Sequence, residues 1–285
     1  MMRFLFLFLS IICLWVPMPA SCATREPFRM GQGMASNGAI LEDSGVSGKD
    51  PFTSACFYGD TFSYGVSIAG VDFFDGMDNM SSLHIAQAGL GGFYASKGFS
   101  LKAAYSHFDA LRAYYEQNGF LSIAYNKAPI VKMSVELYGF RAGLYSLDNT
   151  APQTRLEAGC SALLLFSIGS ISCVLNHVPL KQANNEGYNS PLSIALGAHS
   201  AKNTLGGQGF VLEMQNDHDW QFRVVIAEEF WLAKNCGVLL SLSTNPVLVN
   251  FGIVCTIRSS AIAAAFSDHP VLGWSKGMAI SYAGK

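Results

Sequence analysis

The last residues of the chain contain one short motif that could do chemistry. GWSKG, residues 273–277, fits the G-x-S-x-G pattern in which a strained turn presents a nucleophilic serine. A hydrolase of that type needs its acid and its histidine after the serine. Only ten residues follow Ser275, and none of them is Asp or His. The alternating stretch MAISY comes next, so we interpret this region as the closing strand of a sheet.

No other group of residues predicts catalysis or a metal site. GVSGKD, residues 45–50, departs from a phosphate loop in its glycine spacing and in having Asp50 where Ser or Thr should stand. Four oxygen-bearing residues around Gly76 could hold a weak Ca²⁺, although a solvated loop is the preferred interpretation: Asp72, Asp75, Asp78 and Asn79. The six histidines are scattered. We therefore expect no enzyme activity, no metal and no cofactor.

The first 23 residues predict a cleaved signal peptide. Arg3 gives a positive start, residues 4–16 form an apolar core, and small residues precede a cut after Ala23. An uncleaved anchor is the alternative, but the apolar run is shorter than the roughly 20 residues that span a bilayer. A lipoprotein site at Cys22 is a further alternative. We expect the mature chain to be exported.

Composition narrows the class of the mature protein. Charged residues make up only 13% of the chain and the net charge is −2, while the mean hydropathy is +0.27. A low charge with a high hydropathy is unusual for a surface in water. No basic or acidic block occurs, so nucleic acid is excluded as a partner. A membrane protein would account for both values.

Side chains alternate between apolar and small or polar along most of the mature chain. Two uncharged runs, 158–176 and 236–257, are long enough for membrane helices, but turn residues interrupt both at their centres. Alternation on either side favours a hairpin in each run. The Asn118-Gly119 step predicts another hairpin turn.

The alternation predicts an all-β protein, a single antiparallel transmembrane β-barrel. A soluble sandwich would also alternate, but the second face is rich in Ser, Gly, Ala and Thr. Many predicted strands also match the roughly 9–11 residues of a tilted spanning strand. We expect about 14 strands, with 12 as the alternative, within residues 59–285. Residues 24–58 are expected to form an N-terminal plug or a periplasmic segment.

Several polar residues on the second face are candidates for the barrel interior: Lys132, Glu136, His199, Glu213 and Arg223. A charge inside a barrel must be paired or hydrated. These residues could cross-link a filled interior or line a path for a transported molecule.

Five cysteines remain after processing, and two of them invite a pairing hypothesis. Cys236 and Cys255 are equally far from the Asn245-Pro246 turn. In register, they would lie opposite each other and could form a disulfide. A slip of one residue would separate them.

The final strand resembles the carboxy-terminal signal by which the barrel-assembly machinery accepts its substrates. The signal has a polar-x-Gly-x-x-apolar-x-aromatic spacing, which is met by Ser275, Gly277, Ile280 and Tyr282. The resemblance implies assembly into the outer membrane of a Gram-negative cell, with its lipid as the surrounding solvent. Ala283, Gly284 and Lys285 follow the terminal aromatic residue, a departure from the usual form.

About the last third of the chain resembles the end of the FadL-like superfamily, which includes fatty-acid and aromatic-hydrocarbon transporters and PorV-type barrels. The resemblance rests on Glu229, Asn235, Asn245, Pro246, Gly252, His269, Leu272 and Gly273. It implies passive transport of a small hydrophobic molecule. The alternative is a structural or accessory barrel of PorV type with a secretion-system partner. A soluble secreted β-protein is the third hypothesis.

Overall fold

The fold is described from a computed structural model. Residues 1–53, which include the expected signal peptide, lie outside the described residues. The described residues are 54–57, 64–75, 85–96, 98–110, 113–126, 130–145, 152–182, 192–200, 206–217, 219–245, 247–269 and 273–284.

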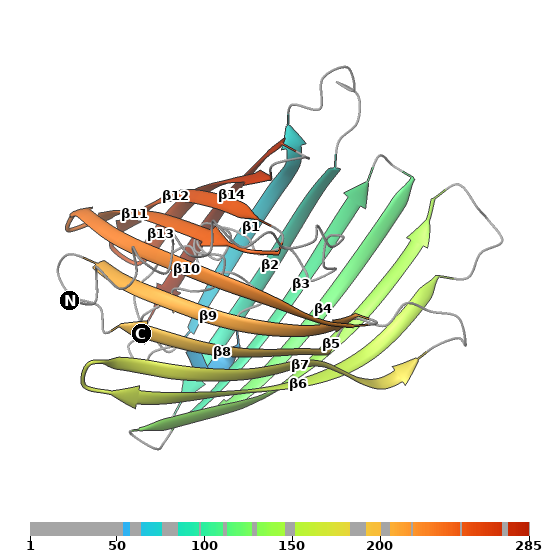
Figure 1. The fold of residues 1–285 in the computed structure, drawn as a ribbon, viewed down its shortest axis with the longest axis horizontal. Coiled ribbons are helices and arrows are strands. Elements are labelled where there is room, and N and C mark those ends of the chain that lie inside the picture. The colour runs from blue at the N-terminus through green and yellow to red at the C-terminus, as the bar shows by residue number, and fades with distance from the viewer. Residues whose placement is uncertain are drawn as a thin grey trace.

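Fourteen antiparallel strands form one closed barrel (Figure 1). Each strand pairs with its neighbours in sequence, and the first pairs with the last. The prediction of an all-β barrel with about 14 strands is therefore confirmed. The strands are β1 (Tyr64–Asp75), β2 (Ile85–Ser96), β3 (Phe99–Ala110), β4 (Tyr114–Tyr125), β5 (Val131–Leu144), β6 (Gln153–Phe166), β7 (Gly169–Gln182), β8 (Leu192–Ser200), β9 (Gly206–Asp217), β10 (Asp219–Ala233), β11 (Cys236–Ser243), β12 (Leu248–Ile257), β13 (Ser260–His269) and β14 (Gly273–Gly284).

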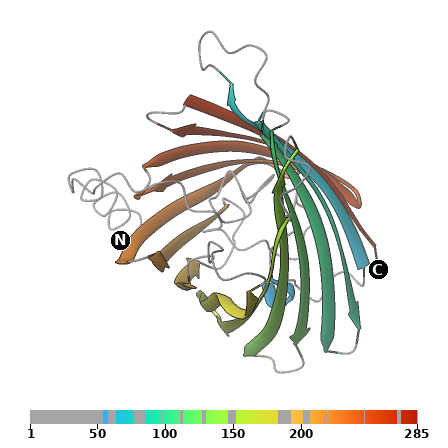
Figure 2. The ribbon, with the colours of Figure 1, turned by 90° about the vertical axis from the view of Figure 1, so that its right-hand side faces the viewer.

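Alternating side chains give each strand an inner and an outer face. In β3, Ser100, Lys102 and Ala104 are buried, whereas Phe99 and Leu101, which alternate with them, are exposed. Closure satisfies the backbone of every strand on both sides, so the sheet has no free edge. Figure 2 shows the green strands and the orange strands on opposite sides of the barrel.

The two uncharged runs form hairpins. The first becomes parts of β6 and β7, joined at Ser167 and Ile168, and the second becomes β11 and β12. Asn245 adopts a positive φ of 46° in the connection after β11, a conformation that Asn tolerates well. Within the described ranges, no helix is long and apolar enough to cross a membrane.

The predicted turn at Asn118-Gly119 is wrong. Both residues lie inside β4, where Asn118 pairs with Ser106 of β3 and Phe140 of β5. The chain turns earlier, between Ala110 and Tyr114. Ladder pairing on both sides of β4 therefore overrides the local turn preference of the dipeptide.

The barrel wall is uneven in height. Strands β5, β6 and β7 each have 14 residues, whereas β11, β12 and β13 have 8, 10 and 10. The connections also differ between the two ends. At the end where β1 begins, connections are short, such as 97–98 and 258–259. At the opposite end, the strand bounds leave connections that range from residue 218 alone to nine residues, as in 76–84 and 183–191.

Candidate functional site

The inner face of the barrel carries the polar residues that the sequence singled out. Lys132, Glu136, His199, Glu213 and Arg223 are all buried. They come from β5, β8, β9 and β10, and they alternate with exposed or half-buried outward residues. The strands therefore place the five side chains on the inner wall.

Glu213 is the centre of a hydrogen-bonded group on β8, β9 and β10. Ser193 donates to Glu213 Oε1 at 2.8 Å, and Gln215 Nε2 donates to the same oxygen at 3.0 Å. Arg223 Nη1 lies 3.5 Å from Oε2. Glu213 and Arg223 are register partners across β9 and β10. The buried carboxylate therefore has both a counter-charge and donors, as a charge in a dry interior requires.

His199, on β8, takes part in a smaller polar contact with β7. Its Nε2 lies 3.0 Å from Ser172 Oγ on β7. Gly197 precedes it on the inner face, and a Cβ at Gly197 would lie 2.3 Å from Ser172 Oγ and 2.6 Å from His199 Nε2. Glycine at this position leaves room for the Ser172–His199 contact.

A second ion-pair group, on β6 and β7, escaped the sequence reasoning. His177 Nδ1 lies 2.8 Å from Glu157 Oε2, and Arg155 Nε lies 3.8 Å from Glu157 Oε1. His177 has a positive φ of 64°. The pairing of β6 with β7 shifts register beside it, between Ala158 and Cys160. This bulge turns His177 inward, and a count of alternate residues cannot locate such a reversal.

Aromatic rings surround this second group. Phe120 and Tyr138 have ring centroids 5.1 Å apart, and those of Tyr138 and His177 are 5.3 Å apart. The Arg155 guanidinium lies 4.1 Å from the centre of the Phe140 ring, which is cation–π geometry. Polar and aromatic side chains therefore share the inner wall from β4 to β7.

Buried charges of the two signs are matched in number on the described part of the inner wall. The positive side chains are Lys102, Lys132, Arg155 and Arg223, and the negative ones are Glu136, Glu157, Glu213 and Glu229. A barrel interior with equal numbers of both charges has no strong preference for an ion of either sign. This balance suits a neutral molecule better than a charged one.

The opposite side of the interior contains an apolar cluster, which we call the apolar wall. Its buried residues come from β1, β11, β12, β13 and β14: Ala69, Val71, Leu239, Val254, Ala263, Ala265 and Ala279. Phe108 and Trp231 pack against them. Five of the fourteen strands therefore contribute to one apolar cluster, which lies beside buried polar residues of the same strands such as Ser241 and Asn250.

A short N-terminal segment, Ser54–Phe57, is bound to the inner wall, and we call it the latch. Ser54 Oγ donates to Glu136 Oε1 at 2.6 Å, and Ser134 donates to the same oxygen at 2.6 Å. The Ala55 backbone N–H donates to Ser122 at 3.0 Å, and its carbonyl accepts from Ser100 at 3.1 Å. Within the described residues, Glu136 Oε2 is buried without a hydrogen-bond partner.

Cys56, in the centre of the latch, is completely buried. It has 0% exposure and clusters with Ala55 and Ala124. The latch therefore holds its central side chain against the wall through packing as well as hydrogen bonds.

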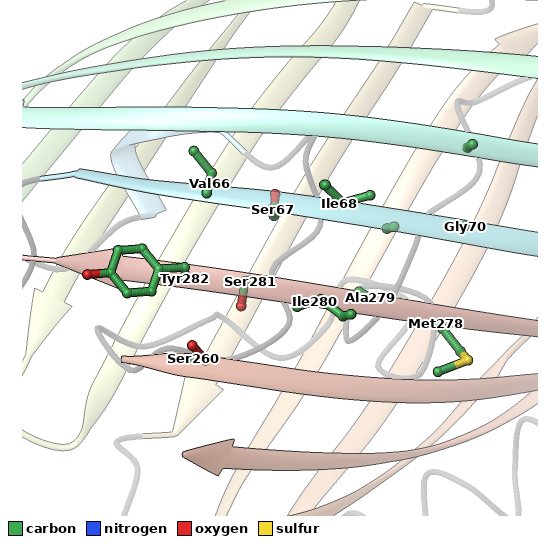
Figure 3. Close-up of a pocket in the computed structure, with 12 residues that line it drawn as sticks. Val66, Ser67, Ile68, Gly70, Ser260, Met278, Ala279, Ile280, Ser281 and Tyr282 are labelled. Carbon is green, nitrogen blue, oxygen red and sulfur yellow. The ribbon is translucent and has the colours of Figure 1, made fainter. Parts of the chain in front are cut away.

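The strand that resembles an assembly signal lies at the seam of the barrel. On β14, Ser275 and Gly277 are buried on the inner face, whereas Ile280 and Tyr282 are exposed on the outer face. Beside them, β1 and β14 form an open apolar hollow of about 500 Å³ (Figure 3). Exposed side chains of Val66, Ile68 and Met278 line it.

Cys236 and Cys255 are direct register partners on β11 and β12. Their Sγ atoms lie 2.7 Å apart, and both residues are free thiols in this structure. The register condition for the predicted disulfide is therefore met.

No family model and no curated protein matches the chain. Solved structures do match. The CymD monoaromatic hydrocarbon channel has a TM-score of 0.62 at 10% identity, over 92% of this chain and 99% of that one. A Pseudomonas aeruginosa FadL homologue has a TM-score of 0.59 at 8% identity, over 92% and 99%.

The Pseudomonas putida toluene transporter TodX gives a similar result, with a TM-score of 0.57 at 9% identity over 86% of this chain and 98% of TodX. At such low identity the likeness concerns the fold. The structural resemblance to FadL-type barrels is thus confirmed, and this chain has the barrel fold of these hydrocarbon channels.

Proposed function

We propose that the chain is an outer-membrane barrel through which small hydrophobic molecules cross passively. The observation that carries the proposal is the inverted placement of its side chains. Ile68 and Val135 are 67% and 62% exposed on the outside, whereas Lys102 and Glu136 are 1% and 0% exposed inside. A protein in water places most such residues the other way round. Lipid as the outer solvent accounts for the inversion.

The interior supports a neutral, apolar cargo. The apolar wall matches such a molecule in polarity, and the matched buried charges provide no binding site for an ion. CymD is a monoaromatic hydrocarbon channel, and TodX is a toluene transporter. We extend that substrate class, small apolar molecules, to this chain.

The latch indicates how one end of the barrel would be closed. We propose that residues 24–58 act as a plug, of which Ser54–Phe57 is the part bound to the inner wall. The residues that hold it, Ser100, Ser122 and Ser134, lie near the barrel end that has the shorter connections. In bacterial barrels that end faces the periplasm. The plug would therefore close the periplasmic exit.

We also propose that β14 carries the assembly signal, since Ile280 and Tyr282 face outward where a folding factor can reach them. Assembly is a separate property from transport.

Two measurements test the transport proposal. The exported chain should require detergent for extraction and should migrate faster on a gel before boiling than after it, because a folded barrel is compact. The purified barrel in liposomes should then increase the uptake of radiolabelled toluene above that of empty vesicles.

A pair of neighbouring substitutions makes the uptake test specific. Ala265 faces the interior with 0% exposure, and Ala264 faces outward and is half-buried. Ala265→Phe should reduce uptake, whereas Ala264→Phe should not. Insertion without any uptake would refute transport and favour the accessory-barrel alternative. A chain that dissolves without detergent would refute the membrane proposal itself.

A further inference from the structure

The β11–β12 hairpin contains a pair of cysteine thiols that have no part in the transport proposal. Cys236 is the first residue of β11, and Cys255 lies near the end of β12. Both lie at the open end of the hairpin, opposite the connection that joins the two strands. A bond between them would therefore close the whole hairpin into a ring.

The backbone hydrogen bonds place the two cysteines at the type of cross-strand pair in which the Cα atoms lie closest together. The Thr256 N–H donates to the Asn235 carbonyl at 2.8 Å, so residues 235 and 256 form a hydrogen-bonded pair. Cys236 and Cys255, the next pair, are then a non-hydrogen-bonded pair. Such pairs have Cα atoms about 4.5 Å apart, within the roughly 4.4–6.8 Å range of disulfides.

The side chains also point to the same place. Both cysteines are half-buried on the outer face, and their Sγ atoms lie 2.7 Å apart. The turn formed by Lys234 and Asn235 lies immediately beside them. A soluble oxidant can therefore reach the thiols from the aqueous side of the barrel end, or before the strands enter lipid.

We propose that Cys236 and Cys255 form a disulfide in the exported chain. The Cys236 thiolate attacks a protein or small-molecule disulfide of the oxidising compartment, which releases one thiol of that oxidant. The Cys255 thiolate then attacks the Cys236 sulfur, forms the intramolecular bond and releases the second thiol. The two cysteines lose two electrons and two protons, and the oxidant is reduced to its dithiol form.

The chain contains its own comparison pair. Cys160 and Cys173 lie on neighbouring strands β6 and β7 and are both exposed on the outer face. Cys173, however, is the register partner of Ala162, and Cys160 is that of Leu175. The two cysteines are diagonal neighbours, with Cα atoms roughly 7–8 Å apart. That separation exceeds the disulfide range of about 4.4–6.8 Å.

The experiment is peptide mapping of the full exported chain. The chain is denatured in iodoacetamide without reductant, digested and analysed by mass spectrometry. We expect a linked peptide pair that contains Cys236 and Cys255, two hydrogens lighter than the free peptides. Cys56, Cys160 and Cys173 should all be alkylated.

Two variants make the result specific. Cys236→Ser should leave Cys255 fully alkylated. Cys236→Ala combined with Val238→Cys moves one thiol two residues along the same face, and it should lower the yield of linked peptide at least tenfold. Alkylation of both Cys236 and Cys255 in the folded wild-type chain would overturn the proposal. Linkage of Cys160 to Cys173 in equal yield would also overturn it, because disulfide formation would then not depend on the register of the two cysteines.

Discussion

Removal of the Ser54 hydroxyl should loosen the latch. In Ser54→Ala, the hydrogen bond of 2.6 Å to the buried Glu136 carboxylate is lost, and such a bond to a charged group contributes about 1.5–3 kcal/mol. Ser134 still donates to the same oxygen, so we expect the variant to lose about 2 kcal/mol of the free energy that holds the latch on the wall. Since about 1.4 kcal/mol is a factor of ten, the released state should become roughly 30-fold more populated.

The assay is the rate at which a water-soluble maleimide labels Cys56 in the folded barrel. Cys56 has 0% exposure, so it reacts only when the latch leaves the wall. Cys160, Cys173, Cys236 and Cys255 are first replaced by alanine, which leaves one thiol in the mature chain. We expect labelling to accelerate by roughly 30-fold if about 2 kcal/mol is lost.

Ser241→Ala is the matched control, because it removes a buried hydrogen bond of 2.9 Å to Asn250 on a different part of the wall. It should leave the labelling rate unchanged. An unchanged rate in Ser54→Ala would refute the idea that this hydroxyl holds the latch. An equal acceleration in both variants would show that labelling follows general loosening of the barrel.

Three further substitutions test the solvent, the interior and assembly. Val135→Arg should lower the free energy of unfolding of the barrel in lipid by about 2–4 kcal/mol. Urea unfolding measures the loss, with Val135→Leu as the control. Equal stability of the two variants would indicate that this 62% exposed side chain faces water. Glu157→Leu should cost about 3–5 kcal/mol in the same assay, because Arg155 and His177 lose their carboxylate; a neutral result would show that this group contributes nothing. Tyr282→Ala should lower the yield of folded barrel in cells but not refolding in detergent, whereas Tyr125→Ala, at the same barrel end, should change neither; equal yields would contradict the assembly signal.

The barrel and its strand number could be predicted because nearly every strand has two faces of different composition. Exposed Val66 and Ile68 alternate with buried Ser67 and Ala69, and this contrast survives in the sequence without any long-range information. The pairing of Cys236 with Cys255 could be predicted for a related reason. Their distances from a single turn fix the register once the hairpin is correct.

The parts that escaped prediction depend on pairing rather than on pattern. The bulge at His177 changes which residues face inward, so the group around Glu157 is visible only when β6 and β7 are placed together. Asn118-Gly119 has the local chemistry of a turn, but partners on two neighbouring strands keep it extended. The latch joins Ser54 to residues about eighty positions away, a contact that no local count contains.

The uneven height of the wall has a consequence for the membrane in which we propose that the barrel lies. At about 3.3 Å per residue and a tilt of roughly 40°, the eight residues of β11 reach only about 20 Å across the bilayer, whereas the fourteen of β5 reach about 35 Å. The usual apolar band is about 25 Å tall. In the proposed membrane, acyl chains beside β11 would therefore compress to match this short strand, and the bilayer would be thinner on this side of the barrel than beside β5.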